Sequence, residues 1–438
     1  MTTRPRIAAR TAGASIQTHA HRTFSSLKVR NYRLYFIGQS ISLCGTWMQG
    51  VAMGLLVLHL TNSGTVLGLV TALQFAPVLF LTPYGGLLAG RFSKRKMLII
   101  TQSAAGLLAL ILGVLVATGT VQLWMVYALA AVLGVVNALD NPVRQTFVHE
   151  LVGHTLLGNA VTLNSVIVNL SRVVGPALAG IVVAQFGLAP CFILNGLSFG
   201  AVLACLFMMR DGELLKAKRV PSAKGQLREG FAYAWKTPIV RDVLIMMALV
   251  GTLSYEFMVS LPLLAHITFH GSEAAVAGEV ALLMSAMGLG AVVGGLVTAG
   301  RRTGTMRSLA IGAFGFGLAM LVVTVAPSLE WAAAGMAVVG YFSVAFTALT
   351  NTILQTVSAP RMRGRVMALW AMAFMGTTVF GGPAIGWIGQ NVGPQWSLAV
   401  GAAASIGAGF VGLRSAKSAV AVEGDVAVLA AAHIEESA

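Results

Sequence analysis

The fold of this protein is indicated by residues 91–117, which read RFSKRKMLIITQSAAGLLALILGVLVA. Four of the first six residues are basic, whereas the 21 residues from Met97 to Ala117 carry no charge. A helix crosses the hydrocarbon core of a bilayer with about 20 predominantly apolar residues, and basic residues collect in the cytoplasmic loops that flank such helices. The stretch therefore predicts a transmembrane helix that begins at the cytoplasmic surface.

The same pattern recurs along the chain. Of its 438 residues, 57% are hydrophobic and only 10% are charged, whereas soluble proteins carry about 25% charged residues. This composition excludes a soluble enzyme, a disordered chain and a nucleic-acid-binding domain. Long apolar runs, unlike the short alternating strands of a barrel, predict an all-α integral membrane protein with twelve transmembrane helices. The expected spans are residues 34–60, 65–89, 97–117, 122–139, 160–184, 188–209, 243–265, 278–299, 308–326, 331–350, 366–389 and 395–413.

The distribution of Lys and Arg supports this count. Of the 29 basic residues, only Arg172 falls inside a predicted span. The others lie in the N-terminal tail, in the connections after spans two, four, six, eight and ten, and at the C-terminal end, and the six alternate connections contain none. The positive-inside rule then predicts a multi-pass protein of the inner membrane with both termini in the cytoplasm.

The longest polar stretch divides the spans into two groups of six. An apolar pattern at helical spacing over 225–238 predicts an amphipathic helix on the membrane surface within this stretch. We expect a basic cytoplasmic tail (1–33), an N-terminal six-helix bundle (34–209), a cytoplasmic linker with the amphipathic helix (210–242), a C-terminal six-helix bundle (243–413) and a loose cytoplasmic tail (414–438).

The two halves repeat each other at equivalent positions. The tripeptide GPA at 175–177 in span five recurs at 382–384 in span eleven. The tripeptide GGL at 85–87, at the end of span two, recurs at 294–296, at the end of span eight. Many secondary transporters are built from such pseudo-repeats, bind substrate at the interface between them and alternate access by rocking.

The N-terminal half contains the motifs NYRL at 31–34, GQ at 38–39, GTWMQ at 45–49 and DNPVRQ at 140–145. These motifs resemble the major facilitator superfamily, in the branch that contains siderophore and drug exporters of the enterobactin-exporter type. The likeness extends over about residues 24–414 and implies the major facilitator fold.

Residues 86–95, GLLAGRFSKR, resemble the family's motif G-x-x-x-D-R-x-G-R-K between spans two and three, with Gly90 in place of the acid. The resemblance implies that Lys94 pairs with Asp140 at the end of span four, and that this latch closes the cytoplasmic side. A partly exposed pair of this kind is expected to contribute about 0–1 kcal/mol. The residues assigned to the latch are Gly86, Arg91, Lys94, Arg95, Asp140 and Arg144.

Span five resembles the family's antiporter motif g-x-x-x-G-P-x-x-G-G. Ser171, Gly175, Pro176 and Gly180 occupy its matching positions, and the resemblance implies an antiporter. The alternative is that these small residues only let helices approach closely. The family's proton-linked arginine in span four is missing, because residues 122–136 carry no charge.

Two charges lie deep inside predicted spans. Arg172 lies in span five and Glu256 in span seven, at similar depths in opposite halves. A charge inside the membrane is costly unless it faces a cavity or a partner, so we expect both to face a central cavity, where they can pair. Glu256, the only deep acid, is predicted to carry the coupling proton. The alternative is a static structural ion pair.

Polar residues also form stripes on two predicted helices. Positions three and four apart share one helix face, and such stripes either join helices or line a watery path. The substrate cavity is therefore expected to include Gln39, Ser42, Thr46, Gln49, Ser165, Asn169, Arg172, Tyr255 and Glu256.

These features predict a secondary active transporter that exports an amphipathic small molecule, drug-like or siderophore-like, by alternating access in exchange for protons. Two alternatives stay open: an uptake or lipid-flipping permease of the same fold, and a non-transporting membrane sensor or scaffold. No phosphate-binding loop G-x-x-x-x-G-K-[ST] occurs, so direct use of ATP is not expected. Neither a metal, a cofactor nor nucleic acid is expected. The expected partners are substrate, protons and membrane lipid, and the expected state is a monomer.

Overall fold

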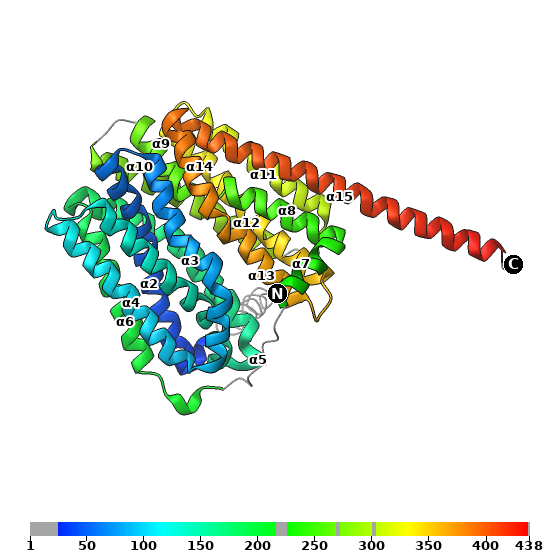
Figure 1. Ribbon diagram of the computed structural model, residues 1–438, viewed down its shortest axis with the longest axis horizontal. Helices are drawn as coiled ribbons and strands as arrows, with labels where there is room; N and C mark the ends of the chain where they lie inside the picture. Colours follow the sequence, from blue (N-terminus) through cyan, green and yellow to red (C-terminus); the bar gives the residue numbers. More distant parts are fainter. Residues whose placement is uncertain (1–24, 216–225, 269–271, 300–303, 437–438) are drawn as a thin grey trace, which may run out of the picture.

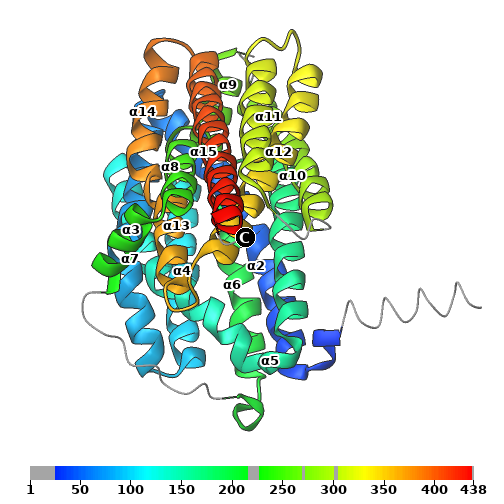
Figure 2. The ribbon, with the colours of Figure 1, turned by 90° about the vertical axis from the view of Figure 1, so that its right-hand side faces the viewer.

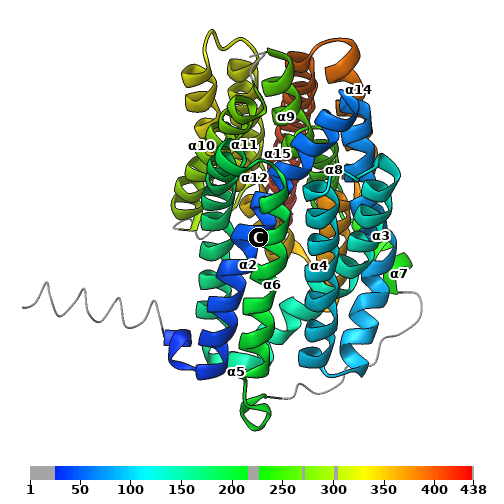
Figure 3. The ribbon, with the colours of Figure 1, turned by 90° about the vertical axis from the view of Figure 1, so that its left-hand side faces the viewer.

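The computed structural model describes residues 25–215, 226–268, 272–299 and 304–436, with side chains for all of these except 83–91, 226–227, 273, 299 and 418–436. These residues form helices and no strands. Two groups of helices stand side by side, one from each half of the sequence (Figure 1). Views from either side show that the long helices run roughly parallel to one another (Figures 2 and 3).

The N-terminal half begins with a short 3₁₀ helix and contains five long helices, and a second 3₁₀ turn follows them. In chain order these are η1 (Ser25–Lys28), α2 (Arg30–Thr61), α3 (Gly64–Arg91), α4 (Lys94–Ala117), α5 (Leu123–Phe186), α6 (Ala189–Phe207) and η2 (Asp211–Glu213).

The C-terminal half follows a short helix, α7 (Gln226–Lys236), which lies within the stretch where the sequence predicts an amphipathic helix. Its remaining elements are α8 (Pro238–Leu253), α9 (Phe257–Thr268), α10 (Glu273–Ala299), α11 (Met306–Thr324), α12 (Leu329–Val357), α13 (Arg363–Ala371), the π-helical turn η3 (Met372–Gly376), α14 (Thr378–Asn391) and α15 (Pro394–Glu436).

Helix α5 contains two spans. It has 64 residues, and a straight helix of that length would measure about 96 Å at 1.5 Å per residue, far more than the ~30 Å hydrocarbon core. Gly153 interrupts it with φ 68° and ψ −173°, a conformation that glycine adopts without steric cost. Eleven helical segments in the described chain are long and apolar enough to cross a membrane. Because α5 crosses twice, the predicted twelve spans are confirmed.

Two spans of the C-terminal half are broken near their middle. Span seven consists of α8 and α9, which are separated by residues 254–256. Span eleven consists of α13 and α14, which are joined by η3. Broken helices inside a membrane protein are tolerated where the irregular backbone is buried in protein or lines a cavity, and π-turns are frequent at functional sites. Because both sequences are apolar throughout, the sequence pattern alone does not indicate these breaks.

The ends of the spans lie on two faces. The basic face holds the ends of α2 and α4 at Arg30 and Lys94, and those of α8 and α13 at Pro238 and Arg363. The opposite face holds the turns that follow α2, α4, the second span of α5, α9, α11 and α14. We use these two names below for the predicted cytoplasmic and outer sides.

Tryptophans gather at the opposite face. Trp124 begins the first span of α5, Trp331 begins α12, Trp387 lies near the end of α14 and Trp396 begins α15. All four side chains are more than half exposed. Since tryptophan concentrates where the hydrocarbon core meets the headgroups, these rings mark one edge of the membrane.

The two predicted tails begin or fold differently from the expectation. The tail 1–33 is shorter than predicted, because η1 packs against α5 and α2 already begins at Arg30; residues 1–24 lie outside the described chain. The prediction that residues 414–438 form a loose tail differs from the structure as far as Glu436. Helix α15 continues through this segment and extends far beyond the bundle (Figure 1). This segment is rich in alanine, which has the highest helix propensity.

Helix α7 is attached to the C-terminal half. Glu229 forms a 2.6 Å ion pair with Arg365 of α13, and the Tyr233 hydroxyl accepts a 3.0 Å hydrogen bond from the Ala359 N–H. Phe231 and Trp235 are 52% and 69% exposed. The helix therefore turns its small residues and Tyr233 toward the bundle and leaves two large apolar side chains outside.

Asn31 ties the start of α2 to the end of α6. Its amide nitrogen donates a 3.0 Å hydrogen bond to the carbonyl of Arg210, and its amide oxygen accepts a 3.1 Å hydrogen bond from the N–H of the same residue. The next residue, Tyr32, donates to the carbonyl of Ala160 at 2.8 Å. The NYRL motif therefore fastens three helices of the N-terminal half together.

Replacing Asn31 by alanine is expected to lower the free energy of unfolding. The substitution removes both hydrogen bonds to the Arg210 backbone; each such bond contributes about 0.5–1.5 kcal/mol, so we expect a loss of about 1–3 kcal/mol. Equilibrium unfolding in detergent measures the loss. Asn391→Ala is the matched control, because Asn391 is exposed and its amide donates to Trp387 on its own helix. Equal stability of the two variants would contradict this role.

Candidate functional site

A central cavity of about 540 Å³ lies between the two halves. The N-terminal half contributes side chains from α2, α3, α4, α5 and α6, and the C-terminal half contributes side chains from the 254–256 break, α9, α10, α12, η3 and α14. Aromatic residues and methionines make up about half of the apolar lining residues, among them Trp47, Phe75, Phe257, Phe374, Met53, Met258, Met284 and Met287. Such side chains suit a ligand with a large apolar surface.

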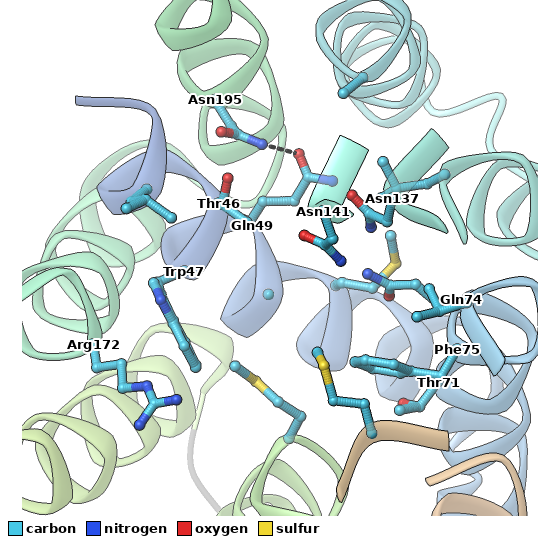
Figure 4. Close-up of a pocket in the computed structure, with 18 of the residues that line it drawn as sticks. Thr46, Trp47, Gln49, Thr71, Gln74, Phe75, Asn137, Asn141, Arg172 and Asn195 are labelled. Atoms are coloured by element: carbon cyan, nitrogen blue, oxygen red, sulfur yellow. Dashed lines mark hydrogen bonds between the residues drawn. The ribbon is translucent and has the colours of Figure 1, made fainter. Parts of the chain in front are cut away.

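Amide side chains form part of the polar wall on the N-terminal half. Gln49, Gln74, Asn137 and Asn141 line the cavity from α2, α3 and α5 (Figure 4). The Asn195 amide donates a 2.7 Å hydrogen bond to Gln49. Sequence reasoning missed Gln74 and Asn137; an uncharged amide inside an apolar span was the signal that could have found them.

The predicted cavity residues divide into two groups. Ser42, Thr46, Gln49, Arg172, Tyr255 and Glu256 line the cavity. Gln39, Ser165 and Asn169 are not among its lining residues. Gln39 instead accepts a 3.3 Å hydrogen bond from Arg144. Asn169 donates to the Ser165 carbonyl one turn earlier, and the Ser165 hydroxyl donates to Val161. The side chains of Ser165 and Asn169 thus form their hydrogen bonds with the backbone of their own helix, and of this stripe only Arg172 reaches the cavity.

Arg172 lies against an aromatic ring. Its guanidinium carbon is 5.3 Å from the centre of the Trp47 ring, within the range of a cation–π contact, and Figure 4 shows the two side chains next to each other. Its Nε is buried without a hydrogen-bond partner. Among the described ion pairs none joins Arg172 to Glu256. The two share the cavity without contacting each other in this state.

Glu256 lies in the break between α8 and α9. Glu256 is 3% exposed. The Thr378 hydroxyl forms a hydrogen bond with its carboxyl group, and one carboxyl oxygen, Oε1, has no hydrogen-bond partner. Its backbone carbonyl accepts hydrogen bonds from Val259 and Ser260, so that Glu256 also begins α9. A carboxyl group held in this way is cheap to bury when protonated and costly when charged.

Asp140 pairs within its own helix. Its Oδ2 lies 2.6 Å from Arg144, and its Oδ1 accepts hydrogen bonds from Thr101 at 2.6 Å and from Gln102 at 2.9 Å. The Asp140 side chain is 2% exposed. Since the pair joins two residues one turn apart, it stabilises the end of span four and does not itself connect the two halves.

The predicted Lys94–Asp140 pair does not form here. Lys94 pairs instead with Glu150 at 2.5 Å, and Arg95 pairs with Asp211 at 2.6 Å. The position along α5 explains the difference: Glu150 lies ten residues beyond Asp140, near the end of the first span and just before the turn at Gly153, whereas Asp140 lies deeper in the span. The latch roles predicted for Gly86 and Arg91 concern residues 83–91, whose side chains the structure does not describe.

The antiporter-like motif lies between helices. Ser171 is buried and accepts a 3.5 Å contact from the thiol of Cys44 on α2. A Cβ added to Gly180 would lie 2.7 Å from the Cβ of Ala281 on α10, in the other half. Gly175 faces Trp47 and the Cys44 carbonyl in the same way. The motif thus sets how closely α5 approaches α2 and α10.

The two halves meet at the opposite face. The Ser63 hydroxyl donates a 2.7 Å hydrogen bond to Gln390 at the end of α14, and Asn62 lies 3.1 Å from the ring nitrogen of His266 on α9. We call the contact of Gly64 and Gly68 on α3 with Gly382 and Gly386 on α14 the opposite-face gate. The gate closes one end of the cavity, whose lining continues toward the basic face as far as Asp140 and Arg144.

Comparison with known proteins places the chain in a family of membrane transporters. A family model described as transmembrane secretion effector matches residues 21–435. The chain is 26% identical to the enterobactin exporter EntS of Citrobacter koseri over 384 residues, 84% of this chain and 88% of the exporter. It is 26% identical to the staphyloferrin A transporter of Staphylococcus aureus over 298 residues, 66% of this chain and 72% of the transporter.

Solved structures with the same fold have low sequence identity. The nucleoside transporter NupG superposes with a TM-score of 0.66 at 13% identity, over 89% of this chain and 98% of that one. A bacterial homologue of the iron transporter ferroportin, in an inward-facing state, superposes with a TM-score of 0.66 at 18% identity, over 89% and 99%. The family match over nearly the whole chain and the twelve-span architecture agree: this protein belongs to the transmembrane secretion effector family of the major facilitator superfamily.

Proposed function

We propose that this protein is a secondary active transporter that exports an amphipathic small molecule in exchange for protons. The observation that carries the proposal is the cavity itself: it lies between the halves, combines aromatic and methionine surface with Arg172 and Glu256, and is closed at the opposite face. The positive-inside rule predicts that the basic face lies in the cytoplasm. In this orientation the present state is inward-open, and substrate enters the cavity from the cytoplasm.

The substrate class follows from the lining. A ligand that fits this cavity offers apolar or aromatic surface to Trp47 and Phe75, and polar groups to the amides of Gln49, Gln74 and Asn141. Siderophores and drug-like molecules have this character, and the relatives named for enterobactin and staphyloferrin A are consistent with it. Glu256 carries the exchanged proton in this proposal, since the other buried acid of the cavity, Asp140, is already paired with Arg144, whereas none of the described ion pairs includes Glu256.

The experiment uses purified protein in liposomes of inverted orientation that contain the pH dye pyranine. A panel of fluorescent anionic, neutral and cationic amphipathic dyes is added, and dye uptake and internal pH are followed together. We expect at least one dye to accumulate when the interior is acid, with proton movement in the opposite direction. Accumulation without proton movement would exclude antiport, and saturable binding without any transport would favour a sensor.

The direction of transport separates the exporter from an uptake permease. In sidedness-controlled liposomes, an exporter loads dye from the basic face when protons are supplied at the opposite face. Loading from the opposite face, driven by the same gradient, would identify a permease that works inward.

A further inference from the structure

The opposite-face gate is built from four glycines on two helices. Gly64 and Gly68 are one turn apart on α3, and Gly382 and Gly386 are one turn apart on α14. A Cβ added to Gly68 would overlap the carbonyl oxygen of Gly382 and lie 2.7 Å from the Cα of Pro383. A Cβ added to Gly386 would overlap the carbonyl oxygen of Gly64. The backbones of α3 and α14 therefore touch, and any side chain here would hold them apart.

The other side of the same α14 segment touches Glu256. A Cβ added to Gly381 would lie 2.9 Å from Glu256 Oε1, and one added to Gly382 would lie 3.6 Å from Glu256 Oε2. Glu256 is 3% exposed, and the Oε1 atom of its carboxyl group has no hydrogen-bond partner. A single segment of α14, residues 381–383, is thus held between the gate helix α3 and an incompletely satisfied buried acid.

We propose that Glu256 operates the opposite-face gate: its neutral form lets residues 381–383 of α14 close on Gly68, and its charged form opens the gate. This inference rests on the proposed proton exchange and assigns it a mechanical partner. The sign follows from charge. A carboxylate that is packed this tightly and has no ion-pair partner is costly to keep charged, so its charged form favours a state in which residues 381–383 move away and leave room for water.

Few other titratable groups lie against Glu256, and the Glu256→Gln variant separates its effect from that of His266, which contacts Asn62 at the opposite face. The elements packed on Glu256 present Thr378, Gly381 and Gly382 from α14, and α3 presents Gly68 behind them; none of these titrates. Tyr255, the neighbour of Glu256 in the chain, donates its hydroxyl to the Ser343 carbonyl at 2.6 Å. The remaining charged residues of the described cavity, Arg172, Asp140 and Arg144, belong to the N-terminal half.

The gate can be followed by the distance between spin labels at the opposite face. Thr120 precedes α5 in the N-terminal half and Val392 follows α14 in the C-terminal half, and both are exposed. Labels on Thr120→Cys and Val392→Cys, with Cys44, Cys191 and Cys205 changed to serine, report the separation by double electron–electron resonance in liposomes. We expect a short distance at pH 5.5, and a rise in the ratio of long to short distances of about tenfold or more at pH 8.5.

Three variants test the assignment on this labelled protein. Glu256→Gln should keep the short distance at both pH values. Gly68→Ala should show the long distance at both, because its methyl group meets the backbone of α14; Gly382→Ala, whose Cβ would meet the Gly68 carbonyl only at 3.0 Å, is the milder form of the same change. Gly200→Ala on α6, where nothing lies within 4 Å of the added Cβ, should behave like the parent protein.

Two results would overturn the inference: a pH response that survives Glu256→Gln, or a short distance that survives in both Gly68→Ala and Gly382→Ala. The liposome transport assay separates this failure from failure of the proposed function. If the parent protein exchanges dye for protons while its gate ignores Glu256, the gate assignment is wrong and the antiport proposal stands. If the gate follows Glu256 but no dye moves protons, the antiport proposal is wrong.

Discussion

Glu256→Gln should abolish proton-driven accumulation of dye in liposomes, down to the rate of liposomes without protein. Glutamine has nearly the shape of glutamic acid and can retain the hydrogen bond with Thr378, but it cannot release a proton. Substrate binding and dye-for-dye exchange, which need no net proton transfer, should persist. The measurement compares uptake driven by a pH gradient with equilibrium exchange in the same preparation.

Glu279→Gln is the control for this variant. Glu279 lies in α10 near the opposite face and is not among the residues that line the cavity, so its replacement should leave gradient-driven uptake close to that of the parent protein. Full gradient-driven uptake by Glu256→Gln would show that the coupling proton travels elsewhere.

Asp140→Asn should destabilise the protein strongly. The sequence suggested a surface pair of about 0–1 kcal/mol, but the Asp140 side chain is 2% exposed and bound by Arg144, Thr101 and Gln102 together. Removing one partner of a buried pair costs about 3–5 kcal/mol. Because 26% of the Arg144 side chain is exposed, where water can reach the guanidinium, we expect the lower end of this range.

Equilibrium unfolding in detergent measures this effect, with Glu213→Gln as the matched control. Glu213 also pairs with an arginine one turn away, Arg210, but the two side chains are 42% and 66% exposed. The control should be close to the parent protein. If both variants lose the same small amount of stability, Asp140 behaves as a surface residue and its burial has no energetic consequence.

Much of the architecture could be predicted because it depends on composition. An apolar run of about 20 residues has few alternatives to a transmembrane helix, and basic loops reveal which ends share a face. What could not be predicted depends on contacts between distant residues. The sequence motif placed Lys94 opposite Asp140, but Glu150, at the basic end of the same span, is the acid that Lys94 pairs with. No local pattern reports which of two acids lies closer in space.

The cavity shows the same limit. Helical periodicity predicted that Ser165, Asn169 and Arg172 share a face, which does not decide whether that face turns toward a ligand. Serine and asparagine can satisfy themselves on the backbone of the preceding turn, and here they do. Arg172 has no such local partner for its long side chain and extends to Trp47. Charge inside the membrane was therefore the more informative signal.

The four tryptophans of the opposite face have a consequence for where this protein works. Exposed tryptophans favour the level of the headgroups, which would hold the ends of α5, α12, α14 and α15 there. In the proposed cycle the halves rock, which would change the tilt of these spans and with it the thickness of hydrocarbon that each state matches. A mismatch costs fractions of a kcal/mol per Å. Bilayer thickness then acts as an effector of the transporter, so that lipids of different chain length should favour different states of the same chain.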